Sequence, residues 1–392
     1  MRKHPSVVIM AILAALTLVL AACQNGGTGS SGDGATGLCR PIGDATAPET
    51  PAPEAAEPGS SDLKIGLVTD VGTLDDRNFN QYSWEGALRG AEIVGAPEPQ
   101  NVITTDSSDY AANIQSFVDE DYDIVVTVGF ALGEATLTAA TDNPDVHFIG
   151  VDQFQAGDDF IAGAGLPNYE SLIFAEAQAG YLAGIVAASI SESGEVAAIG
   201  GSGTIPPVVN YARGFENGAH SVNPDATVHI TYVSDDLAVA FNDPTTGKTF
   251  TDQFRQQNAE VDVIFQVAGK TGNGVLQSVE EGGIYGIGVD VDQWASTPES
   301  AECIVTSAEK KLTLAVSDGI AAVGDGSPRA GNVPYGADND GIGLSPFYQF
   351  EDLIDDETQA AIDDAFEGMA DGSLDPCQPS GLCYAGEADT GT

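Results

Sequence analysis

The sequence is poor in basic residues, and this shortage excludes several classes of partner. Its 392 residues include 13 lysines and arginines against 59 aspartates and glutamates, a formal net charge of −46 at pH 7. Nucleic acid and anionic membrane surfaces attract basic proteins, so we expect neither as a partner. Two interpretations of the acidity stay open. It suits a high-salt habitat, and it also keeps proteins apart in solution at an exposed cell face.

The chain contains few of the residues that build metal centres and nucleophilic active sites. It has four histidines and five cysteines, and no two cysteines have Cys-x-x-Cys spacing. We see no serine and histidine arrangement suited to nucleophilic catalysis. Residues 247–249, Gly-Lys-Thr, match the end of the phosphate-binding loop motif, but Asn242 occupies the position of its first glycine. Residues 269–274 are rich in glycine but lack the glycine spacing of a dinucleotide-binding site. We therefore predict no metal ion and no cofactor.

One long apolar run is present, from Val7 to Ala22, after two basic residues. It has the length of a signal-peptide core and is short for a membrane span. The run ends in LAAC at residues 20–23, where small residues precede a cysteine as in a lipoprotein processing site. We predict a signal peptide over 1–22 and a lipid anchor on Cys23 that holds the protein outside the cytoplasm. Plain secretion and an uncleaved anchor are the alternatives.

The segment that follows, 23–62, is rich in Gly, Ser, Thr, Ala and Pro. Leu38 and Ile42 are its two large apolar residues. Such a segment buries too little apolar surface to offset the entropy that ordering costs. We therefore predict a flexible tether between the lipid anchor and the folded part of the chain.

Four cysteines remain beyond Cys23, and an extracytoplasmic location permits disulfide bonds. Four cysteines allow three pairings. Cys377 and Cys383 flank a loop with proline and glycine and are placed to close a small ring, which would leave Cys39 to join Cys303. Free thiols are the alternative.

Strand-like and helix-like stretches alternate along the rest of the chain, in two successive sets of which the second begins at Glu195. This alternation predicts an α/β fold of parallel sheets with helices on both faces. The expected strands are 64–70, 101–105, 123–129, 147–152, 196–200, 227–233, 261–268, 285–289 and 303–307. The expected helices are 80–94, 110–119, 133–141, 171–190, 208–220, 250–258, 274–281, 312–323 and 356–372. Ser171 is placed to cap the fourth of these helices.

The most informative stretch is 64–86, KIGLVTDVGTLDDRNFNQYSWEG. A buried strand ends at Asp70, a glycine turn follows, and Phe79-Asn80 opens a helix. Open α/β sheets present ligand sites in this way, at the carboxyl ends of their strands. Asp75 and Asp76 are more typical of turn and N-cap positions than of ligand contacts.

This stretch closely resembles the opening motif of the basic-membrane-protein family, V-T-D-x-G-x-x-D-D-x-x-F-N-Q-x-x-W-E-G. Members of that family are lipoproteins that bind purine nucleosides or similar solutes for ABC transporters. Other stretches resemble further motifs of the family in the same order, over about 64–347. They are Gly129-Phe130, 139–152, 176–187, 199–201, 211–218, 268–274, 287–293 and 306–310.

The resemblance implies a type I periplasmic-binding-protein fold, in which two α/β lobes close on a ligand by a hinge motion. It assigns 63–190 to the first lobe, joined by about 303–325. It assigns 191–302 to the second lobe, joined by about 326–372, and leaves 373–392 as a C-terminal tail.

The site residues that the resemblance implies suit a nucleoside. Phe79 and Tyr211 would stack on the purine faces, although family members usually carry Phe at the second position. Asp70 and Asn80 would bind the edge of the base.

On the sugar side, Asp290 would accept hydrogen bonds from the ribose hydroxyls, with Lys310 as its charge partner and a second donor. Gly269 would let backbone amides approach the sugar. The full set of predicted ligand-binding residues is Asp70, Phe79, Asn80, Gly129, Tyr211, Gly269, Asp290 and Lys310.

We therefore predict a monomeric, lipid-anchored solute-binding protein that delivers a purine nucleoside to an ABC permease and is not an enzyme. Three alternatives remain. The same receptor could bind another small solute. The aspartates at 70, 75 and 76 could serve a calcium-dependent nucleoside hydrolase. The protein could also have a purely structural role at the cell surface.

Overall fold

The computed structural model describes residues 37–48, 55–155, 165–378, 383 and 389–391. The predictions for the signal peptide and for Cys23 concern residues outside these ranges. Among the described helices, none combines the length and the apolar character needed to cross a membrane.

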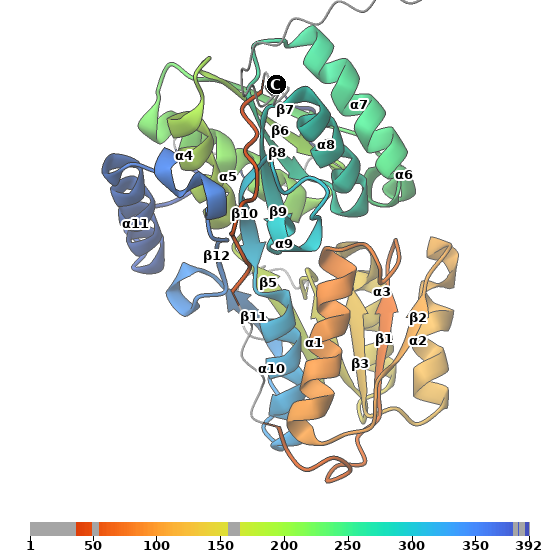
Figure 1. Ribbon diagram of the computed structural model, residues 1–392. Coiled ribbons are helices and arrows are strands. Elements are labelled where there is room, and N and C mark those ends of the chain that lie inside the picture. The colour runs from red at the N-terminus through yellow and green to blue at the C-terminus, as the bar shows by residue number, and fades with distance from the viewer. Residues whose placement is uncertain (1–36, 49–54, 156–164, 379–382, 384–388, 392) are drawn as a thin grey trace, which may run out of the picture. The chain divides into compact units, whose positions relative to one another are not determined.

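The described strands form two six-stranded sheets, each the centre of one lobe (Figure 1). The order in the first lobe is β11-β5-β4-β3-β1-β2, and all its pairs are parallel. Its strands are β1 (Ile65–Thr69), β2 (Gln100–Ile103), β3 (Ile124–Val128), β4 (His147–Val151), β5 (Tyr169–Phe174) and β11 (Gly331–Tyr335). The inner strands β1 and β3 are buried throughout, as apolar strands covered on both faces should be.

The second sheet has the order β12-β10-β9-β8-β6-β7, and its edge strand β12 runs antiparallel to β10. Its strands are β6 (Glu195–Gly200), β7 (Thr227–Tyr232), β8 (Val263–Val267), β9 (Tyr285–Asp290), β10 (Ile304–Lys310) and β12 (Ile342–Leu344). The same strand–helix alternation therefore builds both lobes, and the predicted α/β class is confirmed.

Helices cover the faces of both sheets (Figure 1). The α-helices are α1 (Phe79–Val94), α2 (Tyr110–Asp119), α3 (Gly133–Asp142), α4 (Glu176–Ile190), α5 (Pro206–Val222), α6 (Leu237–Asn242), α7 (Pro244–Gln257), α8 (Gly269–Gly282), α9 (Gln293–Ser296), α10 (Leu312–Gly324) and α11 (Asp356–Ala370). Short 3₁₀ helices are η1 (Ser107–Asp109), η2 (Phe130–Leu132), η3 (Ala337–Asn339) and η4 (Tyr348–Leu353).

The predicted helix 171–190 is wrong in its first part. Ser171 lies inside strand β5, which pairs with β4 and β11, and helix α4 begins only at Glu176. The reason is that an apolar run without clear periodicity suits a buried strand as well as a buried helix.

Strand β11 is absent from the predicted strands. It is a short strand at the edge of the first sheet, a position where a proline such as Pro334 is tolerated.

The lobe boundaries differ from the predicted ones at three places. Helix α4 packs against α5 and so belongs to the second lobe, although 63–190 was assigned to the first. Strand β10 pairs with β9 in the second sheet, whereas 303–325 was assigned to the first lobe as a whole. Strand β11 lies in the first sheet, although it falls within 326–372. Strand periodicity records burial, and it carries no information about which sheet a strand joins.

Helix α4 is the buried centre of the second lobe, with thirteen of its fifteen residues buried. It crosses α5 so closely that a Cβ at Gly180 or Gly184 would overlap the backbone oxygen of Tyr211 or Phe215. Small residues allow this close approach of two helices. Gly180 and Gly184 are therefore packing residues that hold α4 against α5.

The described parts of the predicted tether are docked on the protein, so that prediction is wrong for them. Leu38 N donates to Gly283 O at 2.7 Å, and Leu38 and Ile42 both pack against core clusters. This segment, 37–48, is drawn in red in Figure 1. Residues 55–61 return to the first lobe, where Gly59 N donates to Gly95 O at 2.8 Å. Two large apolar residues are therefore enough to dock the segment 37–48 when a disulfide bond also attaches it to the folded protein.

That covalent bond joins Cys39 to Cys303, and a second disulfide joins Cys377 to Cys383. This is the one of the three possible pairings that the sequence analysis describes. The first bond closes a loop with a sequence separation of 264 residues, whereas the second spans 6 residues. A long loop loses more unfolded-state entropy on cross-linking, so the Cys39–Cys303 bond contributes more to stability in the chain-entropy account.

We expect the double substitution Cys39→Ala and Cys303→Ala to lower the free energy of unfolding by about 2–4 kcal/mol. Denaturant titration of the oxidised proteins measures the change. The matched control is Cys377→Ala with Cys383→Ala, which opens the short ring and should cost less. Equal losses in the two double variants would contradict this account.

Candidate functional site

A cavity with about 690 Å³ of empty space, part of it open to solvent, lies where strands of both sheets end. Small-molecule sites commonly occupy this position in α/β folds. The structure brings all eight predicted site residues together in its wall. The other lining residues are Val71, Asp76, Phe130, Asp152, Ile205, Pro207, Val208, Leu237, Phe241 and Val267.

Asp70 follows β1 and is half-buried in the cavity wall. Its carboxylate accepts hydrogen bonds from Val71 N at 2.6 Å and Ala131 N at 3.3 Å. Burial raises the pKa of Asp70 to about 7, although these amides act in the opposite direction. Gly129 faces it with φ of 114°, and a Cβ there would overlap the Asp70 carboxylate. Gly129 therefore leaves room for the acid as well as shaping the turn.

The start of helix α1 is fixed by Asp76, whose carboxylate accepts from the backbone N–H groups of Asn78, Asn80 and Gln81 at 2.8–3.0 Å. Asp76 thus caps the helix that carries Phe79. The Asn80 side chain donates to Val71 O at 3.0 Å, and its Oδ1 is buried without a hydrogen-bond partner among the described residues. Such an acceptor is costly unless something in the cavity donates to it.

Asp75 neither caps helix α1 nor lines the cavity. It is exposed, and its carboxylate pairs with Lys270 of the second lobe at 2.9 Å. Lys270 also donates to Thr73 at 2.9 Å. Asp76 therefore caps a helix and Asp75 belongs to a surface ion pair, which agrees with the turn and N-cap positions expected for them.

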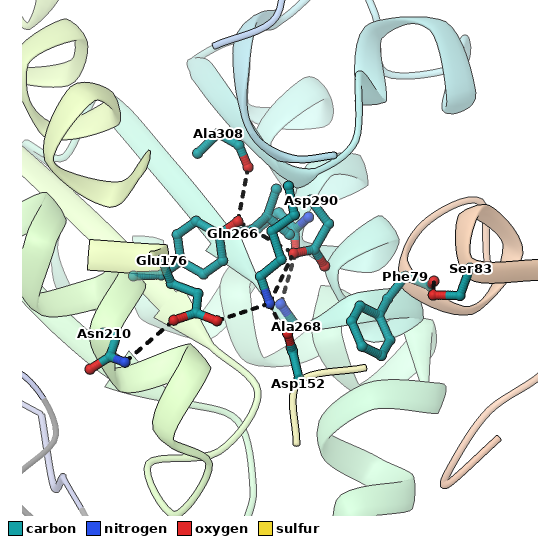
Figure 2. Close-up of polar contacts among 12 residues, drawn as sticks. Phe79, Ser83, Asp152, Glu176, Asn210, Gln266, Ala268, Asp290 and Ala308 are labelled. Atoms are coloured by element: carbon teal, nitrogen blue, oxygen red, sulfur yellow. Dashed lines mark hydrogen bonds and ion pairs between the residues drawn. The ribbon is translucent and has the colours of Figure 1, made fainter. Parts of the chain in front are cut away.

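Lys310 ends strand β10 and is the centre of a buried charge cluster, with a side chain only 2% exposed. Its Nζ lies 2.6 Å from Asp152 Oδ2, 3.4 Å from Glu176 Oε1 and 3.9 Å from Asp290 Oδ1. Figure 2 shows these three carboxylates converging. Burial alone would lower the pKa of Lys310, but the carboxylates outweigh it and raise that pKa. Asp290, the predicted partner of Lys310, is thus the most distant of its three acids.

Asp290 ends strand β9 in a left-handed conformation with φ of 65°, which non-glycine residues adopt rarely and often at functional sites. It is buried, and burial raises its pKa to about 6, with Lys310 acting in the opposite direction. Burial also raises the pKa of Glu176. A single buried ammonium therefore does not fully compensate three buried carboxylates.

Tyr211 lines the cavity but offers little of its ring, because the residue is 1% exposed. Its hydroxyl donates to Ala308 O at 3.3 Å and approaches Asp290 Oδ1 at 3.5 Å. Its ring meets Phe265 edge-on, with centroids 5.8 Å apart. Phe241 of the same lobe is only partly buried, so it offers more aromatic surface to the cavity.

Gly269 begins helix α8 with φ of 52°. The first N–H groups of a helix have no partner within the helix, and they carry partial positive charge. Gly269 therefore presents a donor edge to the cavity on the side of the second lobe.

Among the residues that sequence reasoning missed are Asp152 and Phe241 of the cavity wall and Glu176, which contacts Lys310. A signal existed for Asp152, because it follows the buried strand β4 and closes the family motif at 139–152. Glu176 was visible as one acid in an apolar stretch. No local pattern distinguished Phe241, which lies on the short helix α6.

Two lobes built on mainly parallel sheets, with a cavity of polar and apolar residues at the strand ends, are the arrangement found in ABC transporter solute-binding proteins. The solved structure of such a protein from Aeropyrum pernix K1 superposes with a TM-score of 0.71 at 24% identity, covering 80% of this chain and 92% of that one. One from Conexibacter woesei DSM 14684 gives 0.62 at 26% identity, with 80% and 98% covered.

Residues 64–366 match the family model of PnrA-like ABC transporter substrate-binding proteins, Bmp, and the chain belongs to this family. It is 29% identical over 334 residues to the CD4+ T-cell-stimulating antigen of Listeria monocytogenes, covering 80% of this chain and 88% of that protein. It is also 29% identical over 302 residues to the ABC transporter nucleoside-binding protein BmpA of Lactococcus lactis, with 72% and 82% covered. The predicted family is thereby confirmed.

The raised pKa of Asp70 predicts a pH-dependent contribution to stability. Its pKa rises from an ordinary 3.8 to about 7, so the folded protein holds a proton there that the unfolded chain has lost. Stability linked to this group is therefore lost as the pH rises from about 4 to 7. We expect Asp70→Asn, which is neutral throughout, to become more stable relative to the parent protein over that range.

Urea titrations of ligand-free protein at several pH values measure this difference. The control is Asp364→Asn on the exposed face of α11, which removes the same charge without burial. If Asp70→Asn and the parent protein show parallel profiles, folded Asp70 does not hold a proton over this pH range.

Proposed function

We propose that this substrate-binding protein is a lipid-anchored receptor that closes on a purine nucleoside in the described cavity and delivers it to an ABC permease. The observation that carries the proposal is the pairing of two unlike halves in one cavity. One half holds aromatic rings and base-edge partners, and the other holds the Lys310 cluster of acids.

The aromatic half suits a purine. Phe79 and Phe241 are both partly buried and line the cavity from opposite lobes, where they can contact a flat, polarisable base. The unpartnered Oδ1 of Asn80 accepts from an N–H of the base edge. Asp70, with its pKa near neutrality, can donate or accept at the same edge.

The charged half suits a ribose. Asp152 uses Oδ2 for Lys310, and its Oδ1 is buried without a hydrogen-bond partner in the described structure. Together with Asp290, it provides acceptors for vicinal hydroxyls. Lys310 and the amide edge at Gly269 provide donors for sugar oxygens.

The LAAC sequence at residues 20–23 supports the lipid anchor. The relatives support an extracytoplasmic location, because substrate-binding proteins of ABC transporters work outside the cytoplasm. They also support a binding role over catalysis. The capping of α1 by Asp76 and the pairing of Asp75 with Lys270 leave Asp70 without the neighbours that a hydrolase cluster needs.

Calorimetry with adenosine, guanosine, inosine, uridine and hypoxanthine tests the ligand. We expect heat with the purine nucleosides and weaker binding of the free base. An absence of heat with every nucleoside would reject the ligand while leaving the family in place. Recovery of hypoxanthine after incubation with inosine and calcium would instead support a hydrolase.

We expect Phe79→Ala to weaken inosine binding by about 1–3 kcal/mol, or about 5- to 150-fold in Kd, because stacking on one face of the base is lost. The matched control is Phe347→Ala, which removes another partly buried ring that lies outside the cavity. Equal Kd values for Phe79→Ala and the parent protein would show that Phe79 only packs.

We expect Asp290→Asn to weaken inosine binding by at least about tenfold and hypoxanthine binding much less, because a carboxylate contact to the sugar contributes about 1.5–3 kcal/mol. Calorimetry with both ligands gives the two losses. A similar loss for nucleoside and base would contradict the ribose role of Asp290.

A further inference from the structure

Asp389, in the described segment 389–391, is bound by polar side chains of the second lobe. The Asp389 carboxylate accepts two hydrogen bonds from Arg213 of α5, from Nε to Oδ2 at 2.7 Å and from Nη2 to Oδ1 at 2.6 Å. The hydroxyl of Tyr232 donates to Oδ2 at 2.9 Å. Arg213 is only 6% exposed, so this is a buried arginine with a dedicated partner.

Backbone contacts fix the same segment, 389–391, which we call the C-terminal strap. Asp389 N donates to Gly203 O at 2.8 Å. A Cβ at Gly203 would overlap Asp389 O, and a Cβ at Gly391 would overlap Ile230 O. Gly391 also has φ of 80°, which favours glycine. The two glycines therefore allow the strap to lie directly on the loop after β6, at Gly203, and on strand β7, at Ile230.

The position of this contact links the strap to the cavity. Gly203 and Arg213 are the first and last residues of an eleven-residue segment, 203–213, that supplies one wall of the cavity. Its lining residues are Ile205, Pro207, Val208 and Tyr211. Asp389 therefore binds both ends of this wall, once through its backbone and once through its side chain.

We propose that Asp389 is a positioning residue for ligand binding, and that the docked strap holds the 203–213 wall in the geometry that the ligand meets. The proposal rests on the cavity being the ligand site. Without Asp389, Arg213 keeps Glu216 at 3.0 Å and loses its two-pronged partner. A buried cation that loses a partner destabilises its surroundings, so α5 and the loop before it would shift or loosen.

The first test uses the full chain, a variant that ends at residue 388, and inosine as the probe. We expect removal of 389–392 to raise the Kd for inosine about 3- to 30-fold. A synthetic peptide EADTGT, residues 387–392, should restore the parent Kd when added at saturation, and should not do so in an Arg213→Lys background. Asp389→Asn should reproduce the truncation, whereas Asp364→Asn should not.

The second measurement needs no ligand. Hydrogen exchange of the truncated protein should speed up by about tenfold or more in residues 201–212, while strand β1 in the other lobe stays unchanged. If the intact chain fails to bind inosine, the proposed ligand is wrong and exchange alone decides the role of the strap. If inosine binding and exchange in 201–212 are both unaffected by truncation, or if the peptide restores neither, the strap does not position the wall.

Discussion

A single buried ammonium group, that of Lys310, holds the site together. Its three acids come from different places, with Asp152 on the first lobe, and Glu176 and Asp290 on the second. Each of these carboxylates would be costly to bury alone, and each is tolerated because it lies close to the Lys310 ammonium group. The lysine also lies 5.5 Å from the ring centroids of Phe79 and Tyr211, so aromatic faces complete its surroundings. The cluster thus connects both lobes at the point where a ligand would bind.

The backbone at the strand ends makes this convergence possible. Asp152 and Asp290 both adopt left-handed conformations, with φ of 57° and 65°, immediately where their strands end. Gly129 and Gly269 have positive φ at comparable places. These turns direct carboxylates and amides into the cavity instead of along the sheet. Two aspartates that line the cavity therefore have a backbone conformation that is rare for non-glycine residues, and such conformations are often found at functional sites.

The sequence allowed much of this to be predicted, because the family motifs lie at the strand ends themselves. All eight predicted residues line one cavity, and the strand–turn–helix at 64–86 has the expected form. What escaped prediction depends on tertiary contacts. Strand β5 and helix α4 share one apolar run, so only packing separates them. Glu176 became relevant only when α4 was placed beside β10.

The scarcity of basic residues gives the few that exist unusual structural weight. In the described part of the chain, Lys310, Arg213 and Lys270 each pair with acids far away in the sequence. Arg40 and Arg329 do the same with Asp352 and Glu170. A chain with a net charge of −46 offers each cation a choice of carboxylates, so these five lysines and arginines can form connections between distant parts of the chain. The cost falls on the surplus acids, which repel one another at the surface and must remain solvated there.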